Sequence, residues 1–238
     1  MKNTKILFII PCPIIEDGDL SELPIQTIKT IHNTHYFIAE RAKTTRRFIK
    51  QTEPPYSIQD IFVEELDKHN DYAIPEVVLS WFESGREIGL LSEAGCPCIA
   101  DPGFHVVREA RKHGYKIVSL VGPSSLFLAL MASGLNGQQF SFHGYLSNDA
   151  GKLKQQVRQL EEQATRKGYS QLFIETPYRN VKMMETLLKF LQPSTLLNVS
   201  INLSSAQQVS ETKTVKDWKN NHHKIDLHKS PAVFIIGR

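Results

Sequence analysis

Two stretches of small and polar residues carry the features of a ligand-binding site. In 90-LLSEAGCPCIADPGFHVV-107, a buried strand runs into a loop in which Gly95 and Gly103 lack a Cβ and let a ligand approach the backbone. In 120-LVGPSSLFLALMASGL-135, a strand leads to an apolar helix whose free N–H groups Ser124 can cap. Either stretch alone reads as an ordinary strand-to-helix turn. Together they predict one ligand site above the carboxyl ends of neighbouring parallel strands.

Carboxylates and thiols in the first stretch offer further chemistry. Glu93 and Asp101 have the residue types of a carboxylate pair for hydrolysis. Such residues in turns more often accept hydrogen bonds from backbone N–H groups, and we favour that interpretation. Cys96 and Cys98 form a Cys-x-Cys pair, but no second Cys/His pair at zinc spacing accompanies it. We therefore expect no metal.

A run of basic residues follows the predicted strand 36–40. It comprises Arg41, Lys43, Arg46, Arg47 and Lys50. A run of this kind is usually the solvated face of a helix, but this one begins at the carboxyl end of a strand. Its first four residues are therefore candidate substrate-binding residues that contact phosphates.

Common catalytic signatures are missing from the sequence. It contains no Gly-x-Gly-x-x-Gly after the first strand, no phosphate-binding P-loop and no Gly-x-Ser-x-Gly elbow. These absences argue against a dinucleotide-binding fold and exclude a P-loop. They also leave Ser124 or Ser125 without the usual setting of a nucleophile. The net charge of +3 is too small to require a nucleic-acid partner.

The order of predicted elements indicates two α/β domains in 238 residues, with 41% hydrophobic and 22% charged residues. Strands and helices alternate up to residue 120, which predicts a mostly parallel first sheet. After residue 121 we expect more antiparallel pairing and a mixed second sheet. The predicted domains are 1–120 and 121–238, with a ligand cleft between them. The predicted strands are 5–11, 36–40, 88–91, 117–121, 140–145, 170–176, 195–204, 209–215 and 231–237, with a short one within 58–69.

Sequence features of localisation point to the cytoplasm. The longest apolar run, near 117–135, is interrupted by Gly122 and Pro123, so we expect no membrane span. The N-terminal apolar stretch is short and no small-residue cleavage site follows it. Three cysteines, an odd number, fit a reducing compartment.

Several motifs resemble consecutive blocks of the tetrapyrrole methylase-like superfamily. The branch they resemble most is that of the bacterial small-subunit ribosomal RNA 2′-O-cytidine methyltransferases. The matching blocks are LFIIPCPI at 7–14, IAE at 38–40, LLSEAGCPCIADPGFHVVREARKHG at 90–114, VGPSSLFLALMASGL at 121–135, FSFHGYL at 140–146, LFIETPYRNV at 172–181 and PAVFIIG at 231–237. The long block around 93–103 is the most specific of them.

The resemblance implies a methyltransferase of the EC 2.1.1 class that binds S-adenosylmethionine as a homodimer. It also implies cofactor-binding positions, each matched to a family motif. These are Pro11 at the end of the first strand, Gly95, Cys96 and Ile99 in the glycine-containing loop, Ser124 and Ser125 at the helix start, and Glu175 after a later strand. Methyl transfer from a sulfonium needs mainly in-line placement of donor and acceptor, and a hydroxyl acceptor also needs a base. No base is identified at this stage.

The chain departs from the RNA-modifying branch on the acceptor side. Glu40-Arg41-Ala42-Lys43 replaces the family's Glu-Asp-Thr-Arg, and 145–152 and 201–207 also differ from it. Three hypotheses stay open. The first is methylation of a ribose 2′-hydroxyl in ribosomal RNA, the second is methylation of a small molecule such as a tetrapyrrole, and the third is S-adenosylmethionine binding without catalysis.

Overall fold

The computed structural model describes residues 5–15, 18–66, 72–221, 225–228 and 230–238. Its chain divides into two compact units, Met1–Ser124 and Ser125–Arg238. The sequence placed the domain boundary after residue 120, four residues before this division. Each unit is described by itself.

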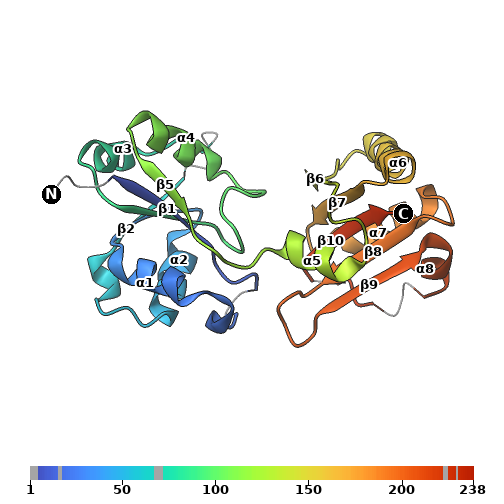
Figure 1. Cartoon of the computed structure of the whole chain (residues 1–238), viewed down its shortest axis with the longest axis horizontal. Helices are drawn as coiled ribbons and strands as arrows, with labels where there is room; N and C mark the ends of the chain where they lie inside the picture. Colours follow the sequence, from blue (N-terminus) through green and yellow to red (C-terminus); the bar gives the residue numbers. More distant parts are fainter. Residues whose placement is uncertain (1–4, 16–17, 67–71, 222–224, 229) are drawn as a thin grey trace. The chain divides into compact units, whose positions relative to one another are not determined.

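The first unit is built on a parallel sheet of five strands (Figure 1). The strands are β1 Ile6–Ile10, β2 Tyr36–Ala39, β3 Phe62–Glu65, β4 Ile88–Leu91 and β5 Lys116–Ser119. Their order is β3-β2-β4-β1-β5, and every pair among the described strands of this sheet is parallel. Because β4 lies between β1 and β2, the chain reverses its direction of travel across the sheet at this point.

Helices cover both faces of the first sheet (Figure 1). They are α1 Ile25–Asn33, α2 Ala42–Gln51, α3 Glu76–Glu83 and α4 Phe104–Lys112, with short 3-10 turns at Leu20–Glu22 and Ile58–Asp60. Leu7 and Ile9 of β1 pack against α3 and α4, whereas Phe8 and Ile10 join the core formed with α1 and α2. Side chains of a strand alternate between faces, so one apolar run supplies both cores.

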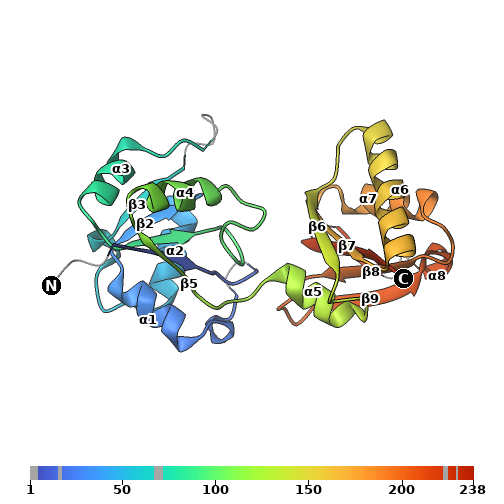
Figure 2. The same cartoon turned by 45° about the horizontal axis from the view of Figure 1, so that its top comes forward.

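The second unit is built on a mixed sheet (Figure 2). Its strands are β6 Phe140–Tyr145, β7 Ser170–Glu175, β8 Leu196–Ile201, β9 Val209–Thr214 and β10 Ala232–Gly237. Their order is β6-β7-β10-β8-β9, in which β6 and β7 are parallel and the other neighbouring pairs are antiparallel. The predicted combination of a parallel first sheet and a mixed second sheet is confirmed.

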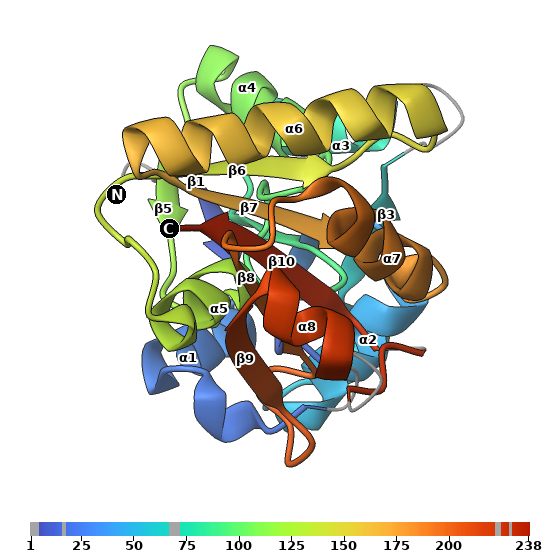
Figure 3. The same cartoon turned by 90° about the vertical axis from the view of Figure 1, so that its right-hand side faces the viewer.

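The helices of the second unit are divided unevenly between the faces of its sheet. They are α5 Ser125–Ser133, α6 Ala150–Lys167, α7 Asn180–Phe190 and α8 Val215–Asn221. The last three cover one face, with Phe173 and Phe234 stacked in the core beneath them (Figure 3). The short α5 packs on the other face, against Val233 and Ile235.

Helix α8 is the element that the sequence analysis missed. It begins directly after β9, and Trp218 is fully buried with its indole N–H donating to the Leu197 carbonyl at 2.7 Å. Its start carries a capping signal, because Asp217 N–H donates to Thr214 Oγ1 at 3.1 Å. Among the described residues, no helix combines the length and apolar character needed to cross a bilayer.

Candidate functional site

The loops that follow β1 and β4 are joined at the carboxyl edge of the first sheet. Cys12 N–H donates to the Gly95 carbonyl at 2.9 Å, and Gly95 N–H donates to the Pro13 carbonyl at 3.4 Å. All strands of this sheet are parallel, so both loops leave it at the same edge. They meet where the strand order reverses, which is the usual ligand position in open α/β sheets.

The loop that follows β5 reaches the same edge. Cys96 Sγ donates to the Pro123 carbonyl at 3.3 Å. A Cβ on Gly122 would lie 2.2 Å from Cγ of Pro11, so only glycine allows this close approach. The structure thus brings together Pro11, Gly95 and Cys96 with the residue that precedes Ser124.

A strained turn completes the loop after β4. Cys98 and Ala100 have positive φ angles of 71° and 63°. The Asp101 carboxylate holds this turn by accepting hydrogen bonds from Cys98 N–H at 2.8 Å and Gly103 N–H at 2.7 Å. The expectation that Asp101 binds backbone N–H groups is confirmed. Ile99, at the exposed tip, is 52% accessible to solvent.

Burial raises the pKa of four ionisable groups in these loops. Burial raises the pKa of Asp101, although its two backbone hydrogen bonds act in the opposite direction. Burial and the charge of Asp101 together raise the pKa of Cys98 to about 12 and raise that of Cys96 as well. The pKa of Cys12 is raised mainly by its complete burial. At neutral pH these cysteines are thiols rather than thiolate nucleophiles, and the thiols of Cys12 and Cys96 donate hydrogen bonds to backbone carbonyls.

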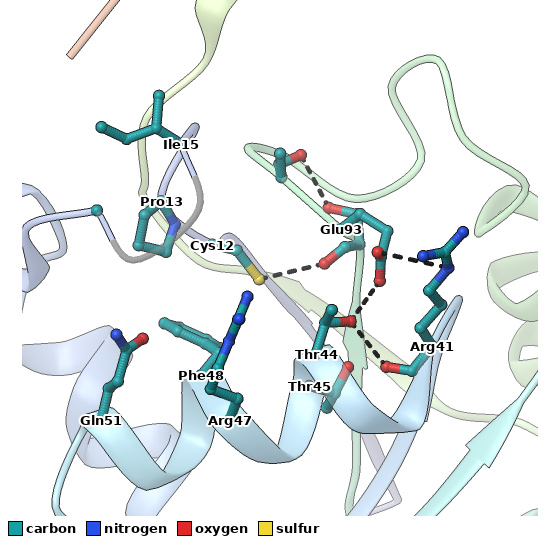
Figure 4. Close-up of a pocket in the computed structure, with 13 residues that line it drawn as sticks. Cys12, Pro13, Ile15, Arg41, Thr44, Thr45, Arg47, Phe48, Gln51 and Glu93 are labelled. Atoms are coloured by element: carbon teal, nitrogen blue, oxygen red, sulfur yellow. Dashed lines mark hydrogen bonds and ion pairs between the residues drawn. The ribbon is translucent and has the colours of Figure 1, made fainter. Parts of the chain in front are cut away.

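A cavity of about 300 Å³ lies beside this loop cluster, within the first unit (Figure 4). We call it the α2 cavity. Its walls come from the loop after β1, one face of α2 and the first residues after β4. The lining residues are Cys12, Pro13, Ile15, Gly18, Arg41, Thr44, Thr45, Arg47, Phe48, Gln51, Ser92, Glu93 and Ala94. The sequence analysis singled out only Arg41, Arg47 and Glu93 among them.

Glu93 contacts a side chain of α2 across this cavity (Figure 4). Its Oε1 accepts a hydrogen bond from Thr44 Oγ1 at 2.6 Å, and its Oε2 lies 3.9 Å from Nε of Arg41. The favoured interpretation of Glu93 as a turn residue is therefore wrong, since its recorded partners are side chains of another element. Asp101, by contrast, is such a residue, so the two carboxylates do not form a pair.

The predicted basic residues of α2 do not share one role. Arg41, Lys43 and Arg47 are exposed. Arg46 is half-buried, and its guanidinium donates to the Ile61 carbonyl at 3.2 Å and to the Ile58 carbonyl at 3.4 Å. Arg46 thus links α2 to the segment that precedes β3 by hydrogen bonds. The other three basic side chains face solvent or the cavity.

The spacing of residues on α2 was a signal that the sequence analysis did not use. Thr44, Thr45 and Phe48 come three, four and seven residues after Arg41, which places the four residues on one side of a helix. Had 42–51 been read as a helix beside the reversal of strand order, this face would have predicted the cavity wall.

Two further candidates belong to the second unit. Ser125 is the first residue of α5 and is half-buried, as is Ser124 at the end of the first unit. Glu175, at the end of β7, has a side chain with 0% exposure. Its Oε1 accepts from Thr176 N–H at 2.7 Å, and its Oε2 lies 3.0 Å from Nη2 of Arg179. Among the described residues, no group of three or more His, Cys, Asp or Glu side chains is arranged to hold a metal ion.

Comparison with known proteins gives one family and a consistent set of relatives. The model of the Tetrapyrrole (Corrin/Porphyrin) Methylases family matches residues 17–218. Ribosomal RNA small subunit methyltransferase I from Buchnera aphidicola (subsp. Schizaphis graminum) is 26% identical over 200 residues, which are 84% of this chain and 66% of that protein. The protein of the same name from Bacillus subtilis is 28% identical, over 78% of this chain and 60% of the relative. That from Streptococcus pyogenes is 32% identical, over 75% and 58% respectively. The chain thus spans about two thirds or less of the length of these three relatives.

Solved structures share the fold at low sequence identity. Cobalt precorrin-4 methyltransferase, a cobalamin biosynthetic enzyme, matches with a TM-score of 0.64 and 13% identity, over 98% of this chain and 95% of that chain. The methyltransferase CobJ matches with a TM-score of 0.62 and 15% identity, over 98% and 93%. At these identities the likeness shows a common fold.

Proposed function

Since the chain belongs to the tetrapyrrole (corrin/porphyrin) methylase family, a family of methyltransferases, we propose that it methylates a ribose 2′-hydroxyl of ribosomal RNA. The observation that carries this proposal is the alignment of ribosomal RNA small subunit methyltransferases along 75–84% of the chain. The aligned span is long enough to include both the glycine-containing loop and the helix start of α5.

The methyl donor of this proposal is S-adenosylmethionine, the donor used by the family. The first unit supports it with closely packed loops at the edge of its sheet, where Pro11, Gly95, Cys96 and Ile99 would contact the cofactor. Small residues there expose backbone carbonyls and N–H groups, which suit the amino-acid and adenosine parts of the molecule. Ser124, at the end of this unit, is a further proposed contact. The bound cofactor supplies an activated methyl group, so the chain has to place the acceptor and take up its proton.

The acceptor side of the proposal rests on α2. Arg41, Lys43 and Arg47 present exposed cations that suit a phosphate backbone. The α2 cavity beside them, at about 300 Å³, is at the lower end of the size of small-molecule sites, roughly 300–1,000 Å³. A cavity of this size suits one nucleoside better than a tetrapyrrole macrocycle.

A second candidate is methylation of a soluble small molecule, and one observation favours it. Arg46 donates to the carbonyls of Ile58 and Ile61, so the cationic surface is smaller than the sequence indicates. Fewer phosphate contacts fit a compact acceptor better than a long RNA.

Two experiments test the proposal in sequence. Calorimetry with S-adenosylmethionine and S-adenosylhomocysteine should show binding of both, and absence of binding at millimolar concentration would exclude any methyl transfer from this donor. Ribose-methylation mapping of RNA from a strain without the gene should then show one lost modification that the plasmid-borne gene restores. An unchanged methylation map, with cofactor binding intact, would favour the small-molecule acceptor.

The proposal includes a homodimer in solution. Light scattering of the purified chain should give twice the mass of 27.1 kDa. A monomer mass at the concentration used for activity would contradict this part alone.

A further inference from the structure

The position of Glu93 places its carboxylate between the α2 cavity and the loop proposed to hold the cofactor. It lies two residues after β4 and two residues before Gly95, whose carbonyl accepts from Cys12 N–H at 2.9 Å. The Glu93 side chain itself lines the cavity (Figure 4). An acceptor in the cavity would therefore lie next to both the carboxylate and the proposed donor loop.

The contacts of Glu93 orient its carboxylate and leave it accessible to a ligand. Thr44 Oγ1 donates to Oε1 at 2.6 Å, which orients the group. The Nε of Arg41 is 3.9 Å from Oε2, beyond hydrogen-bond distance, and the Glu93 side chain is 34% exposed. An ionised carboxylate has about four lone-pair sites for hydrogen bonds, so Oε2 has room for one more donor.

The walls of the cavity suit a ring that carries hydroxyl groups. Pro13, Ile15 and Phe48 provide apolar surface, whereas Thr44 and Gln51 provide polar groups. This mixture of apolar surface and a few polar groups is typical of sites that orient a small ligand.

Other groups at the same edge are less suited to accept a proton. Both oxygens of Asp101 accept hydrogen bonds from backbone N–H groups within its own turn. The raised pKa values of Cys96 and Cys98 keep their thiols protonated at neutral pH. Among the described residues that line the cavity, Glu93 is the one carboxylate.

We propose that Glu93 is the general base that takes the proton from a hydroxyl acceptor bound in the α2 cavity. This inference rests on the proposed function. In the step, the acceptor oxygen bonds to the methyl carbon while the carbon–sulfur bond breaks, and that bond's electron pair stays on sulfur. The hydroxyl proton passes to Oε2 of Glu93 and then to water. Thr44 is a positioning residue, since it acts through the carboxylate.

The test compares Glu93→Gln with the wild type in single-turnover methylation of small ribosomal subunits from a strain without the gene. The glutamine keeps an oxygen for Thr44 but cannot accept a proton. We expect the rate to fall about 10²- to 10⁴-fold, while the affinity for S-adenosylmethionine changes less than about twofold.

A matched control separates chemistry from the placement of α2. Glu65 Oε1 accepts a hydrogen bond from Ala42 N–H at 2.6 Å at the start of the same helix, and Glu65 does not line the cavity. Glu65→Gln should keep most of the wild-type rate. If its rate fell as far as that of Glu93→Gln, the effect would come from helix placement and the base would be elsewhere.

The outcomes distinguish the two proposals. A wild type that methylates the subunits and a Glu93→Gln variant of similar rate would overturn the role of Glu93 and leave the function standing. A wild type that binds the cofactor without methylating the subunits would overturn the ribosomal RNA function, and the inference that rests on it. Loss of cofactor affinity in Glu93→Gln would contradict the base, because the carboxylate would then be a cofactor contact.

Discussion

Glu93 in the first unit lies just after the carboxyl end of a strand and Glu175 in the second lies at one, but the two carboxylates differ in environment. Glu93 follows β4 with a side chain that is 34% exposed and 3.9 Å from its nearest recorded cation. Glu175 ends β7 with 0% exposure and an Arg179 guanidinium at 3.0 Å. The first carboxylate is open to a ligand, whereas the second is enclosed by the loop that follows it.

This difference follows from the elements that surround each strand end. In the first unit, side chains from α2 and from the loop after β4 meet across a cavity, so their contacts depend on two separate elements. In the second unit, Arg179 is four residues after Glu175 and also donates to the Ser147 carbonyl at 3.3 Å. The local contact between Glu175 and Arg179 encloses the carboxylate. The contact between Glu93 and Thr44 joins two elements beside a cavity, which leaves room for a ligand.

The largest effect on stability should come from the enclosed carboxylate. Glu175→Ala removes a fully buried carboxylate and its ion pair with Arg179, whose remaining partners are backbone carbonyls, and we expect the free energy of unfolding to fall by about 3 kcal/mol. Glu93→Ala should cost less than about 1 kcal/mol, because exposed pairs contribute little. Urea unfolding of both variants measures the two values. Equal decreases in the free energy of unfolding would contradict the distinction between the two carboxylates.

A smaller effect should separate two glycines with the same backbone requirement. Gly95 and Gly114 have φ angles of +66° and +76°, so alanine at either position should cost about 1–2 kcal/mol of stability. Only Gly95 lies in the loop proposed to contact the cofactor. Calorimetry should show at least about a tenfold decrease of S-adenosylmethionine affinity in Gly95→Ala and none in Gly114→Ala. Equal affinities in the two variants would place the cofactor away from this loop.

Smaller still, the exposed cations of α2 should affect the salt dependence of RNA binding. Replacing Arg41, Lys43 and Arg47 with Gln should lower the slope of log affinity against log salt concentration by about 0.7 to 0.9 for each phosphate that the variant no longer neutralises. Arg46→Gln should leave the slope unchanged and lower stability instead, because its donors are held by backbone carbonyls. Filter binding over a salt series measures both. If Arg46→Gln lowered the slope as much as replacement of each of the other three, Arg46 would also contact phosphate, as predicted from the sequence.

The smallest effect is a pH dependence at Asp101. Burial raises the pKa of this carboxyl above its ordinary value of 3.8, so the native state binds its proton more tightly than the unfolded state does. The resulting stabilisation is fully present below about pH 3.8 and is lost as the pH rises through the native pKa. The stability of the wild type relative to Asp101→Asn should therefore decrease as the pH rises above about 3.8. A difference that increases with pH would indicate that the backbone hydrogen bonds outweigh burial.

Much of the fold was predictable because its local signals agree with its global arrangement. The apolar run of β1 and the alternation of strands with helices gave the parallel sheet, and Gly114 and Gly168 mark helix ends with positive φ angles. Helix α8 was missed because its polar residues show little periodicity around one buried tryptophan. The Thr214 part of its capping signal lies inside the stretch 209–215 that was predicted as a strand.

The candidate site was less predictable because it depends on contacts between distant segments. Asp101 could be assigned from its turn alone, since its partners are two and three residues away. Glu93 could not, because Thr44 is 49 residues earlier in the sequence. Arg46 was grouped with its basic neighbours although helix geometry turns it toward the carbonyls before β3.

The strand order of the first sheet also bears on how the chain emerges from the ribosome. Strand β4 lies between β1 and β2 but is synthesised after β1, β2 and β3. Until residue 91 is available, β1 and β2 cannot complete their pairing, and each exposes an unpaired apolar edge. Nascent chains shorter than this should depend on chaperones and be prone to aggregate, and the sheet should form only when β4 inserts. The residues that follow β4 are those of the loop with Glu93 and Gly95, so the site is assembled in the same event that closes the sheet.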